Sequence, residues 1–187
     1  MGFLDTLLGR SKPVPPNLDQ LFALPSAAVT LQAATRFRPT GTGAVCFKAA
    51  EGGAFTGLTE HIEALLVLDE GRFTSTTDRF GYSWLRRPGD PDNLEGLVTD
   101  LHAVNTSLVE AGYGAALLCT VVAFADDHRP LGLIYLYKRG TWYPYAPAPG
   151  EHRDSALELQ VKAVVQDDLR MEQDLSRWFP VYDAPGL

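Results

Sequence analysis

Residues 115–138 of the chain read AALLCTVVAFADDHRPLGLIYLYK and contain two near-continuous apolar runs. The first run is Ala115–Ala125, the second is Leu131–Lys138, and the polar residues 126–129 separate them. This pattern predicts two strands joined by a short turn. Because both runs are apolar at successive positions, we expect both strands to be buried on two sides, in the middle of a sheet.

A long amphipathic helix is expected directly before these strands, over Pro91–Ala111. Asp90 is placed to cap its first turn, Pro91 occupies its first position, and Gly112 follows its last residue. The apolar residues of this segment recur at helical spacing and form one stripe: Leu94, Leu97, Val98, Leu101, Val104 and Leu108. We expect this stripe to pack against the sheet.

The chain after the two strands predicts one more strand and one more helix. A turn at residues 138–140 leads to the strand Thr141–Tyr145, and a helix is expected from about Arg153 to Gln166. The final residues, Asp174–Leu187, carry Trp and Pro and are expected to pack irregularly on the domain. The apolar residues of the helix that point inward are Leu157, Val161, Val164 and Val165.

The first third of the chain is less regular. Asn17 is placed to cap a short helix that Pro25 ends, and Ser26–Thr35 is compatible with either a helix or a strand. Residues Ala44–Ala49 predict a short strand. A further helix with a closing glycine is indicated by Leu58, Ile62, Leu65, Leu66 and Gly71.

A strand pair is expected over Arg72–Thr77 and Phe80–Arg87. In its second strand, Phe80, Tyr82 and Trp84 alternate and therefore lie on one face. Strand groups separated by helices predict an α+β fold, with a mostly antiparallel sheet and helices packed on it.

Residues 1–16 precede this domain, which we expect to be a single unit over residues 17–187. Residues 1–10, the tab, are amphipathic, because Phe3, Leu4, Leu7 and Leu8 would share one face of a helix. The linker that follows is Pro-rich and favours an extended path. The tab is too short for a stable helix in water or a lasting membrane anchor. We expect the tab to dock on a protein partner, on a second copy of the chain or on its own domain. Contact with a lipid surface would be weak and reversible.

The charge distribution argues against a nucleic-acid-binding protein. The net charge is −7, and the two parts of the chain differ in sign. Residues 1–50 hold five basic and two acidic side chains, whereas the remainder holds eleven and twenty-one. Phosphate binding needs a basic patch, which the acidic remainder does not predict.

Cysteine content and hydropathy indicate a cytoplasmic protein. Cys46 and Cys119 lie in apolar runs and are expected to be buried free thiols rather than a disulfide. No apolar run approaches the length of about 18–20 residues that spans a bilayer. We therefore expect a protein that is at most peripheral to the inner membrane face.

No pattern of catalytic or metal-binding residues is present in the sequence. The four histidines have no metal-type spacing to one another or to cysteine. A phosphate-binding loop, a dinucleotide fingerprint and a nucleophile elbow are also missing. We expect no enzyme activity, no metal and no cofactor.

The densest aromatic and basic segment, Leu131–Pro147, is a candidate partner-binding surface. Aromatic side chains beside cations can line a peptide groove, and this surface would join the tab in binding a partner. The alternative is that the segment forms a sheet core with a cationic turn. The candidate residues in it are Lys138, Arg139, Trp142 and Tyr143.

The chain resembles the PspAB family, the PspA-associated proteins of actinobacteria, nearly from end to end. The resemblance implies a partner of phage-shock protein A (PspA), the membrane-surface protein of envelope stress, and it brings no catalytic residues. The order of elements is also loosely similar to the type III secretion chaperone-like fold. The segments that carry the family resemblance are Met1–Gln32, Thr99–Asn105, Tyr135–Pro147, Ala156–Lys162 and Asp174–Leu187.

Two functions follow as expectations. The first is a non-enzymatic adaptor of the phage-shock system that binds PspA or another protein near the membrane. The alternative is a small-ligand-binding or catalytic domain with a pocket beside the aromatic strands, under Trp84 or Trp142. A closed pocket with converging polar groups would favour the alternative, and a solid core would remove it. A homodimer is compatible with both.

Overall fold

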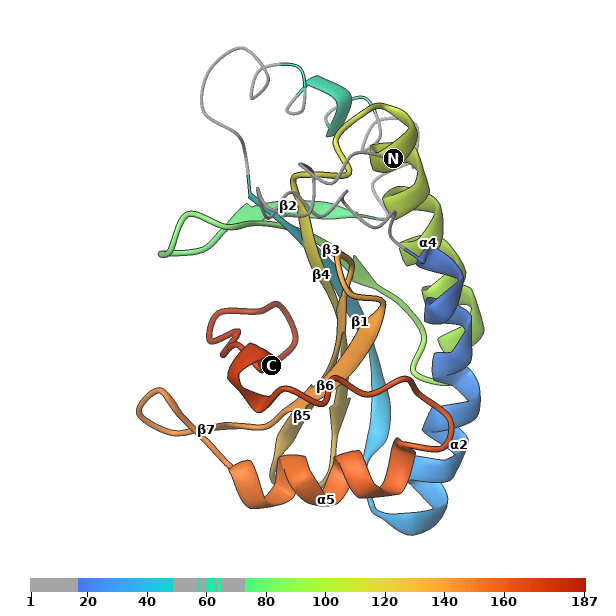
Figure 1. Ribbon diagram of the computed structural model, residues 1–187, viewed down its shortest axis with the longest axis vertical. Coiled ribbons are helices and arrows are strands. Elements are labelled where there is room, and N and C mark those ends of the chain that lie inside the picture. Colours follow the sequence, from blue (N-terminus) through green and yellow to red (C-terminus); the bar gives the residue numbers. More distant parts are fainter. Residues whose placement is uncertain (1–16, 49–56, 58–59, 63, 65–72) are drawn as a thin grey trace, which may run out of the picture.

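A six-stranded antiparallel sheet, with the order β2–β3–β1–β4–β5–β6, is the frame of the protein. The computed structural model describes residues 17–48, 57, 60–62, 64 and 73–187. The predicted class, an α+β fold with helices packed on an antiparallel sheet, is confirmed (Figure 1). The strands are β1 (Arg38–Phe47), β2 (Thr74–Thr77), β3 (Ser83–Pro88), β4 (Leu117–Ala125), β5 (Pro130–Leu136) and β6 (Thr141–Tyr145).

The two apolar runs form neighbouring strands inside the sheet, as predicted. β4 pairs with β1 on one side and with β5 on the other. The Asp126 carboxylate closes the β4–β5 turn by accepting hydrogen bonds from the backbone N–H groups of His128 (3.0 Å) and Arg129 (2.7 Å). Val121 and Val122 are both fully buried on opposite faces of β4, which explains the continuous apolar sequence.

The long helix is α4 (Leu94–Glu110), and its start differs from the prediction. Asn93 is the cap, because its side chain accepts a hydrogen bond from the Gly96 N–H at 3.0 Å. Asp90 instead accepts from the Asp92 N–H at 2.9 Å, so the predicted first turn is a separate turn before the helix. The predicted stripe faces the core, with Leu94 and Val104 partly buried and the other four residues buried.

Helix α4 packs closely on β1. A Cβ atom at Gly43 would lie 2.6 Å from the Leu101 Cδ1 atom, so the glycine is what permits this approach. Leu101 itself is fully buried. The contact fixes the long helix across the middle of the sheet.

Two helical segments near the start of the chain correct one prediction and complete another. The 3₁₀ helix η1 (Leu18–Ala23) continues directly into α2 (Leu24–Ala34). Pro25 lies in the first turn of α2 and does not end a helix, because a first-turn residue needs no N–H partner. Asn17 precedes η1 but makes no side-chain cap. The ambiguous segment after Pro25 is therefore helical.

Strand β1 begins six residues before its predicted start at Ala44. Its Thr- and Gly-containing first half still pairs with β4, through a register shift between Pro39 and Gly43. The predicted strand pair is confirmed as β2 and β3. Ile62 is buried as expected, whereas Leu58, Leu65, Leu66 and Gly71 lie outside the described residues.

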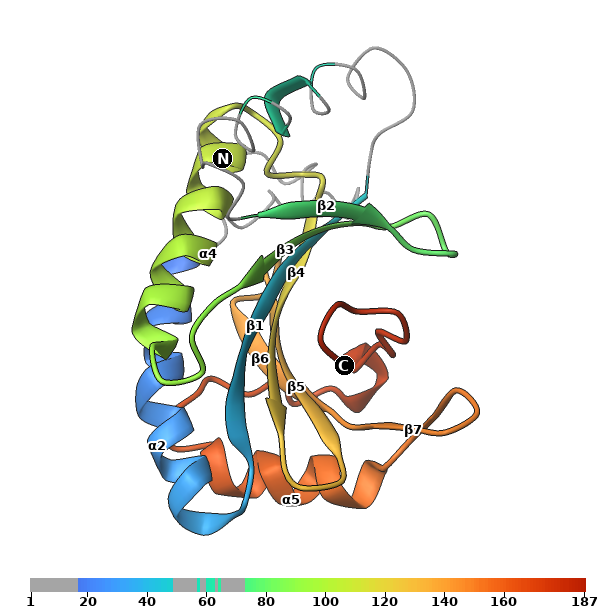
Figure 2. The ribbon, with the colours of Figure 1, turned by 180° about the vertical axis from the view of Figure 1, so that it is seen from behind.

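The two faces of the sheet are covered differently (Figures 1 and 2). Helices η1, α2, α4 and α5 (Ser155–Val165) cover one face, which we call the helix face. The C-terminal segment, residues 173–187, lies against the concave face, which we call the tail face. It contains only a short 3₁₀ helix, η2 (Leu175–Arg177), so the irregular packing predicted for the tail is confirmed.

The edge at β6 is closed by the chain itself. The Trp142 N–H donates to the Arg170 carbonyl oxygen at 2.8 Å, and the Glu172 N–H donates to the Trp142 carbonyl oxygen at 2.7 Å. Between these segments lie a small hairpin, β7 (Pro147–Ala148) and β8 (His152–Arg153), and then α5. Asp154 caps α5 by accepting from the Leu157 N–H at 2.9 Å.

Within the described residues, we found no helix with the length and hydropathy needed to cross a membrane.

Candidate functional site

A cavity of about 560 Å³ lies on the tail face, between the sheet and the C-terminal segment. Its floor comes from the strands and is mostly apolar: Cys46, Trp84, Leu118, Cys119, Leu136 and Tyr143. Its two walls come from the β2–β3 hairpin and from the C-terminal segment: Asp78, Phe80, Tyr82, Phe179, Pro180, Val181 and Tyr182. The cavity therefore brings together parts of the chain that are more than 100 residues apart.

The hairpin wall is organised by Asp78. Its carboxylate accepts hydrogen bonds from the backbone N–H groups of Phe80 and Tyr82 and from the Trp84 indole, each at 2.9 Å. Phe80, Tyr82 and Trp84 all line the cavity, but β3 begins only at Ser83 and Phe80 lies in the turn before it, so strand alternation does not place all three. Because all three bonds converge on one carboxylate, Asp78 is fully engaged in positioning this wall.

The tail wall is held by hydrogen bonds to its backbone. The Tyr143 hydroxyl donates to the Phe179 carbonyl oxygen at 2.8 Å, and Arg153 Nη1 donates to the Trp178 carbonyl oxygen at 2.5 Å. The Trp178 ring stacks on Tyr143 with centroids 6.0 Å apart. Phe179 is left 58% exposed and Phe80 52% exposed, so two large apolar side chains border the cavity and face solvent.

Cys46 and Cys119 are direct cross-strand neighbours in the floor, and both are free and buried. A hydrogen bond with the Cys119 side chain, together with burial, holds the pKa of the Cys46 thiol far above its ordinary range. Burial likewise raises the pKa of Tyr143 well above its usual value. Both groups are protonated at neutral pH, and a protonated thiol is a poor nucleophile.

Basic side chains border one part of the cavity: Lys48, Lys138, Arg139 and Arg177. Arg139 Nε lies 2.6 Å from a Glu172 carboxylate oxygen, and Arg177 Nε lies 2.9 Å from Asp174. Lys138 is exposed and makes no ion pair within the described part of the chain. Lys138 therefore supplies a positive charge that is available to a ligand.

The Glu172 carboxylate fixes Arg139 in this border. Burial alone would raise the pKa of the Glu172 carboxyl, but hydrogen bonds from the Asp174 N–H, Arg139 and Thr141 outweigh burial and lower that pKa. The bonds from Asp174 and Thr141 are 3.1 and 2.9 Å long. Glu172 is 3% exposed, so this charge is held in place rather than offered to a ligand.

The chain matches the family described as PspA associated protein B over residues 1–186. It belongs to that family. Membership associates the protein with the phage-shock system, and the resemblance read from the sequence is confirmed. No curated protein and no solved structure matched the chain, so the likeness to type III secretion chaperones stays a prediction.

The predicted partner-binding residues are divided between the two faces. Lys138, Arg139 and Tyr143 line the cavity. Trp142 does not, because alternation along β6 places it in the helix-face core, where it is fully buried and packs on Tyr135 with ring centroids 5.1 Å apart. The pocket expected under Trp84 or Trp142 therefore lies under Trp84. Phe3, Leu4, Leu7 and Leu8 lie outside the described residues.

Sequence reasoning missed most of the cavity. It did not connect Cys46 with Cys119, and it did not assign Phe179 or Val181 to any site. Strand alternation could have placed Cys46 on this face, since Val45 and Phe47 both face the helices, but Leu118 and Cys119 line the floor together where the β1–β4 register shifts. The position of the tail had no such signal, because irregular segments have no periodicity.

The described histidines lie apart from the cavity. His61 Nε2 is 3.3 Å from the Ser107 hydroxyl, and His102 Nε2 is 3.4 Å from Asp19 on the helix side. Among the residues with described positions, no group of three or more His, Cys, Asp or Glu side chains could hold a metal ion.

Proposed function

We propose that this protein is a non-enzymatic adaptor of the phage-shock system and that the tail-face cavity binds an apolar segment of PspA beside the membrane. The observation that carries the proposal is the pair of exposed phenylalanines, Phe80 and Phe179, at the border of an apolar cavity. Exposed apolar surface around a concave site is typical of protein and ligand interfaces. Family membership supports PspA as the partner.

The lining defines what the partner segment presents. An apolar floor of this size accommodates large aliphatic or aromatic side chains, and burying each would contribute about 1.5–3 kcal/mol. Lys138 and Lys48 at the border favour acidic residues beside those side chains. The expected binding element is therefore a short acidic segment with apolar anchors.

The side chains around the cavity support the non-enzymatic part of the proposal. In the described part of the protein, none of the residues that line it is a histidine, serine or threonine. The Cys46 thiol is held protonated, and Asp78 is engaged by three hydrogen bonds. A general base and an activated nucleophile are therefore not paired in this lining.

A second candidate, binding of a small apolar ligand, is favoured by the cavity volume. Small-molecule sites typically occupy about 300–1,000 Å³, and this cavity falls within that range. Such a ligand would be uncharged and would fill the apolar floor without depending on the Lys138 charge at the border. The Lys138→Glu substitution therefore separates the two candidates.

Calorimetric titration of the full-length protein with purified PspA tests the adaptor function. The variants Phe179→Ser and Lys138→Glu should each weaken binding at least tenfold. Matched controls are Leu159→Ser, at an apolar residue on α5 that is 48% exposed, and Arg36→Glu, at a surface cation. Absence of binding by the unaltered protein, or equal loss in variants and controls, would contradict the proposal.

A further inference from the structure

We propose that the chain's own tab docks in the tail-face cavity and masks it, with Phe3, Leu4, Leu7 and Leu8 facing the apolar floor. The docking itself does not depend on PspA. Its consequence, competition between the tab and PspA, rests on the proposed function. Four observations carry the proposal: where the chain leaves the described body, how far it can reach, what the cavity accepts, and how the tether changes the affinity needed.

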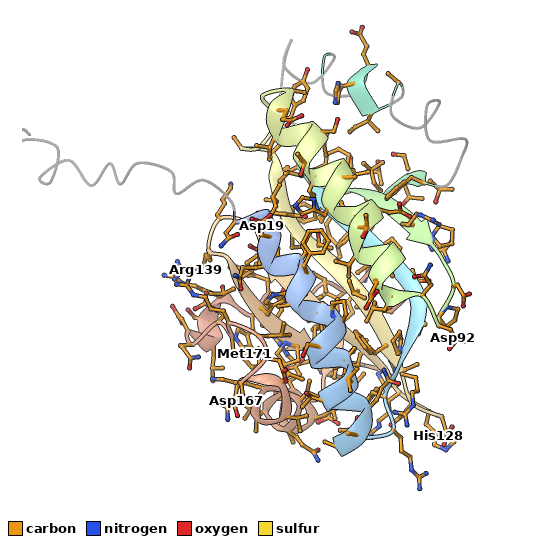
Figure 3. All side chains as sticks on the ribbon, turned by 90° about the vertical axis from the view of Figure 1, so that its right-hand side faces the viewer. Asp19, Asp92, His128, Arg139, Asp167 and Met171 are labelled. Atoms are coloured by element: carbon orange, nitrogen blue, oxygen red, sulfur yellow. The ribbon has the colours of Figure 1, made fainter. Side chains whose placement is uncertain are left out.

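The chain leaves the described body beside the cavity border. The Tyr135 hydroxyl donates a hydrogen bond to the Asn17 carbonyl oxygen, and a Cβ atom on Gly140 would lie 3.8 Å from Asn17 Cβ. Gly140 belongs to the β5–β6 turn, which also contains Lys138 and Arg139 of the cavity border. Figure 3 shows Asp19 and Arg139 at the same end of the molecule, opposite His128.

The linker is long enough to bring the tab from this point into the cavity. Eight residues, 9–16, separate Leu8 from Asn17, and the nine Cα–Cα steps between them span roughly 30 Å at about 3.1–3.6 Å each. The path starts at the turn that forms one side of the cavity, so the linker has only to pass over the end of the sheet. Its proline content favours an extended path over a collapsed coil.

The tab has the chemistry that the cavity accepts. Its four apolar side chains would lie on one face of a helix, and the cavity offers an apolar floor bordered by Phe80 and Phe179. Asp5 lies on the other face of such a helix, and Arg10 balances its charge. The tab therefore shares the apolar anchors of the partner segment that the same lining favours.

Tethering makes even a weak contact effective. A short linker whose length matches the span holds its segment at an effective concentration on the order of 1 mM. A tab that would bind with a dissociation constant of about 0.1 mM as a free peptide is then docked about nine-tenths of the time. A partner competing for the cavity would bind about tenfold more weakly than it binds the open form.

Site-specific photo-crosslinking of the purified full-length chain tests the docking without PspA. A benzophenone amino acid replaces Phe3 in one variant and Thr6, on the opposite helix face, in the matched control. We expect the Phe3 probe to crosslink within its own chain to Tyr82, Phe179 or Val181, at least fivefold more than the Thr6 probe. Equal or dispersed crosslinking, or none, would overturn the docking.

An equal mixture of isotopically labelled and unlabelled chains identifies the occupant. Crosslinks confined to one isotope support docking within the chain, whereas mixed pairs would assign the cavity to the tab of a second copy and overturn the proposal. Crosslinks lost on addition of phosphatidylglycerol vesicles alone would assign the tab to a lipid surface and overturn it as well.

The competition is tested separately, by titrating PspA into the full-length variant Phe3→Ser/Leu7→Ser. Binding about tenfold tighter than that of the unaltered protein is expected. Intramolecular crosslinks without any PspA binding would leave the docking standing and contradict the proposed function. PspA binding that the tab substitutions weaken or leave unchanged would overturn the masking role.

Discussion

The two faces of the sheet share the same strands but differ in how they are completed. On the helix face, Leu101 and Trp142 are fully buried under regular helices. On the tail face, an irregular segment held by hydrogen bonds from Tyr143 and Arg153 leaves a cavity with exposed phenylalanines. The comparison shows how one sheet can bury a closed core on one side and keep an open cavity on the other.

Truncating one side chain on each face tests whether the two faces are packed to different degrees. Leu101→Ala should lower the free energy of unfolding by about 3 kcal/mol, because it opens a void under α4. Tyr82→Ala, in the cavity wall, should cost under about 1 kcal/mol, because its ring is already partly solvated. Urea denaturation measures both values. Equal losses would mean that the tail face is as tightly packed as the helix face.

Enlarging a side chain on each face probes the same difference. Ala28→Leu, on α2 in the helix-face core, should cost about 2 kcal/mol because no space is available. Cys119→Leu, in the cavity floor, should change the unfolding free energy by less than about 1 kcal/mol. Thermal and urea unfolding would measure the pair. A large loss for Cys119→Leu would show that the floor does not tolerate filling.

Each face also carries one tyrosine that anchors an end of the described chain. Tyr135 donates to the Asn17 carbonyl on the helix face, and Tyr143 donates to the Phe179 carbonyl on the tail face. Replacing either with Phe should cost about 1 kcal/mol of stability. Hydrogen exchange should then increase near residue 18 for Tyr135→Phe and in residues 179–187 for Tyr143→Phe. Exchange that spreads across both ends would contradict independent anchoring.

The smallest effect concerns a turn that belongs to neither face. Hydrogen bonds from Arg129 and from the His128 backbone lower the pKa of Asp126 from 3.8 to about 2. The Asp126 carboxyl therefore binds a proton less readily in the folded state than in the unfolded state. The stabilisation that its charged form gives the folded state is present above about pH 4 and disappears as the pH falls to about 2. The stability difference between the natural chain and Asp126→Asn should shrink over that interval.

The control for this pH series is Asp127→Asn, which removes the same charge from a side chain 3.8 Å from Arg36 and largely exposed. Its difference from the natural chain should be small, because an ion pair between exposed side chains contributes little to stability. An equal pH dependence in the two variants would mean that the Asp126–Arg129 pair contributes nothing specific.

Periodicity predicted the parts of the fold whose burial repeats along the chain. The stripe on α4 and the pairing of β4 with β5 both follow from it. The first residue of α4 was less predictable, because Asp90 and Asn93 are both residue types that cap helices. The turn between them decides that Asn93 is the cap.

The candidate site was predicted in part. Lys138, Arg139 and Tyr143 were identified from a local cluster of aromatic and basic residues, but the same cluster wrongly drew Trp142 onto that face. Phe179 and Cys46 were missed, because they come to the site through long-range packing of segments with no repeating pattern. A cavity built from distant segments leaves little local signal in a sequence.

Closure of the β6 edge by residues 170–172 also limits self-association. Unpaired strand edges recruit other strands and promote aggregation. At one end of this sheet the hydrogen-bonding groups of Trp142 are already paired, and at the other end β2 consists of Thr and Ser residues that are all exposed. At the β6 edge, a strand of another chain would therefore find the backbone groups of Trp142 already paired.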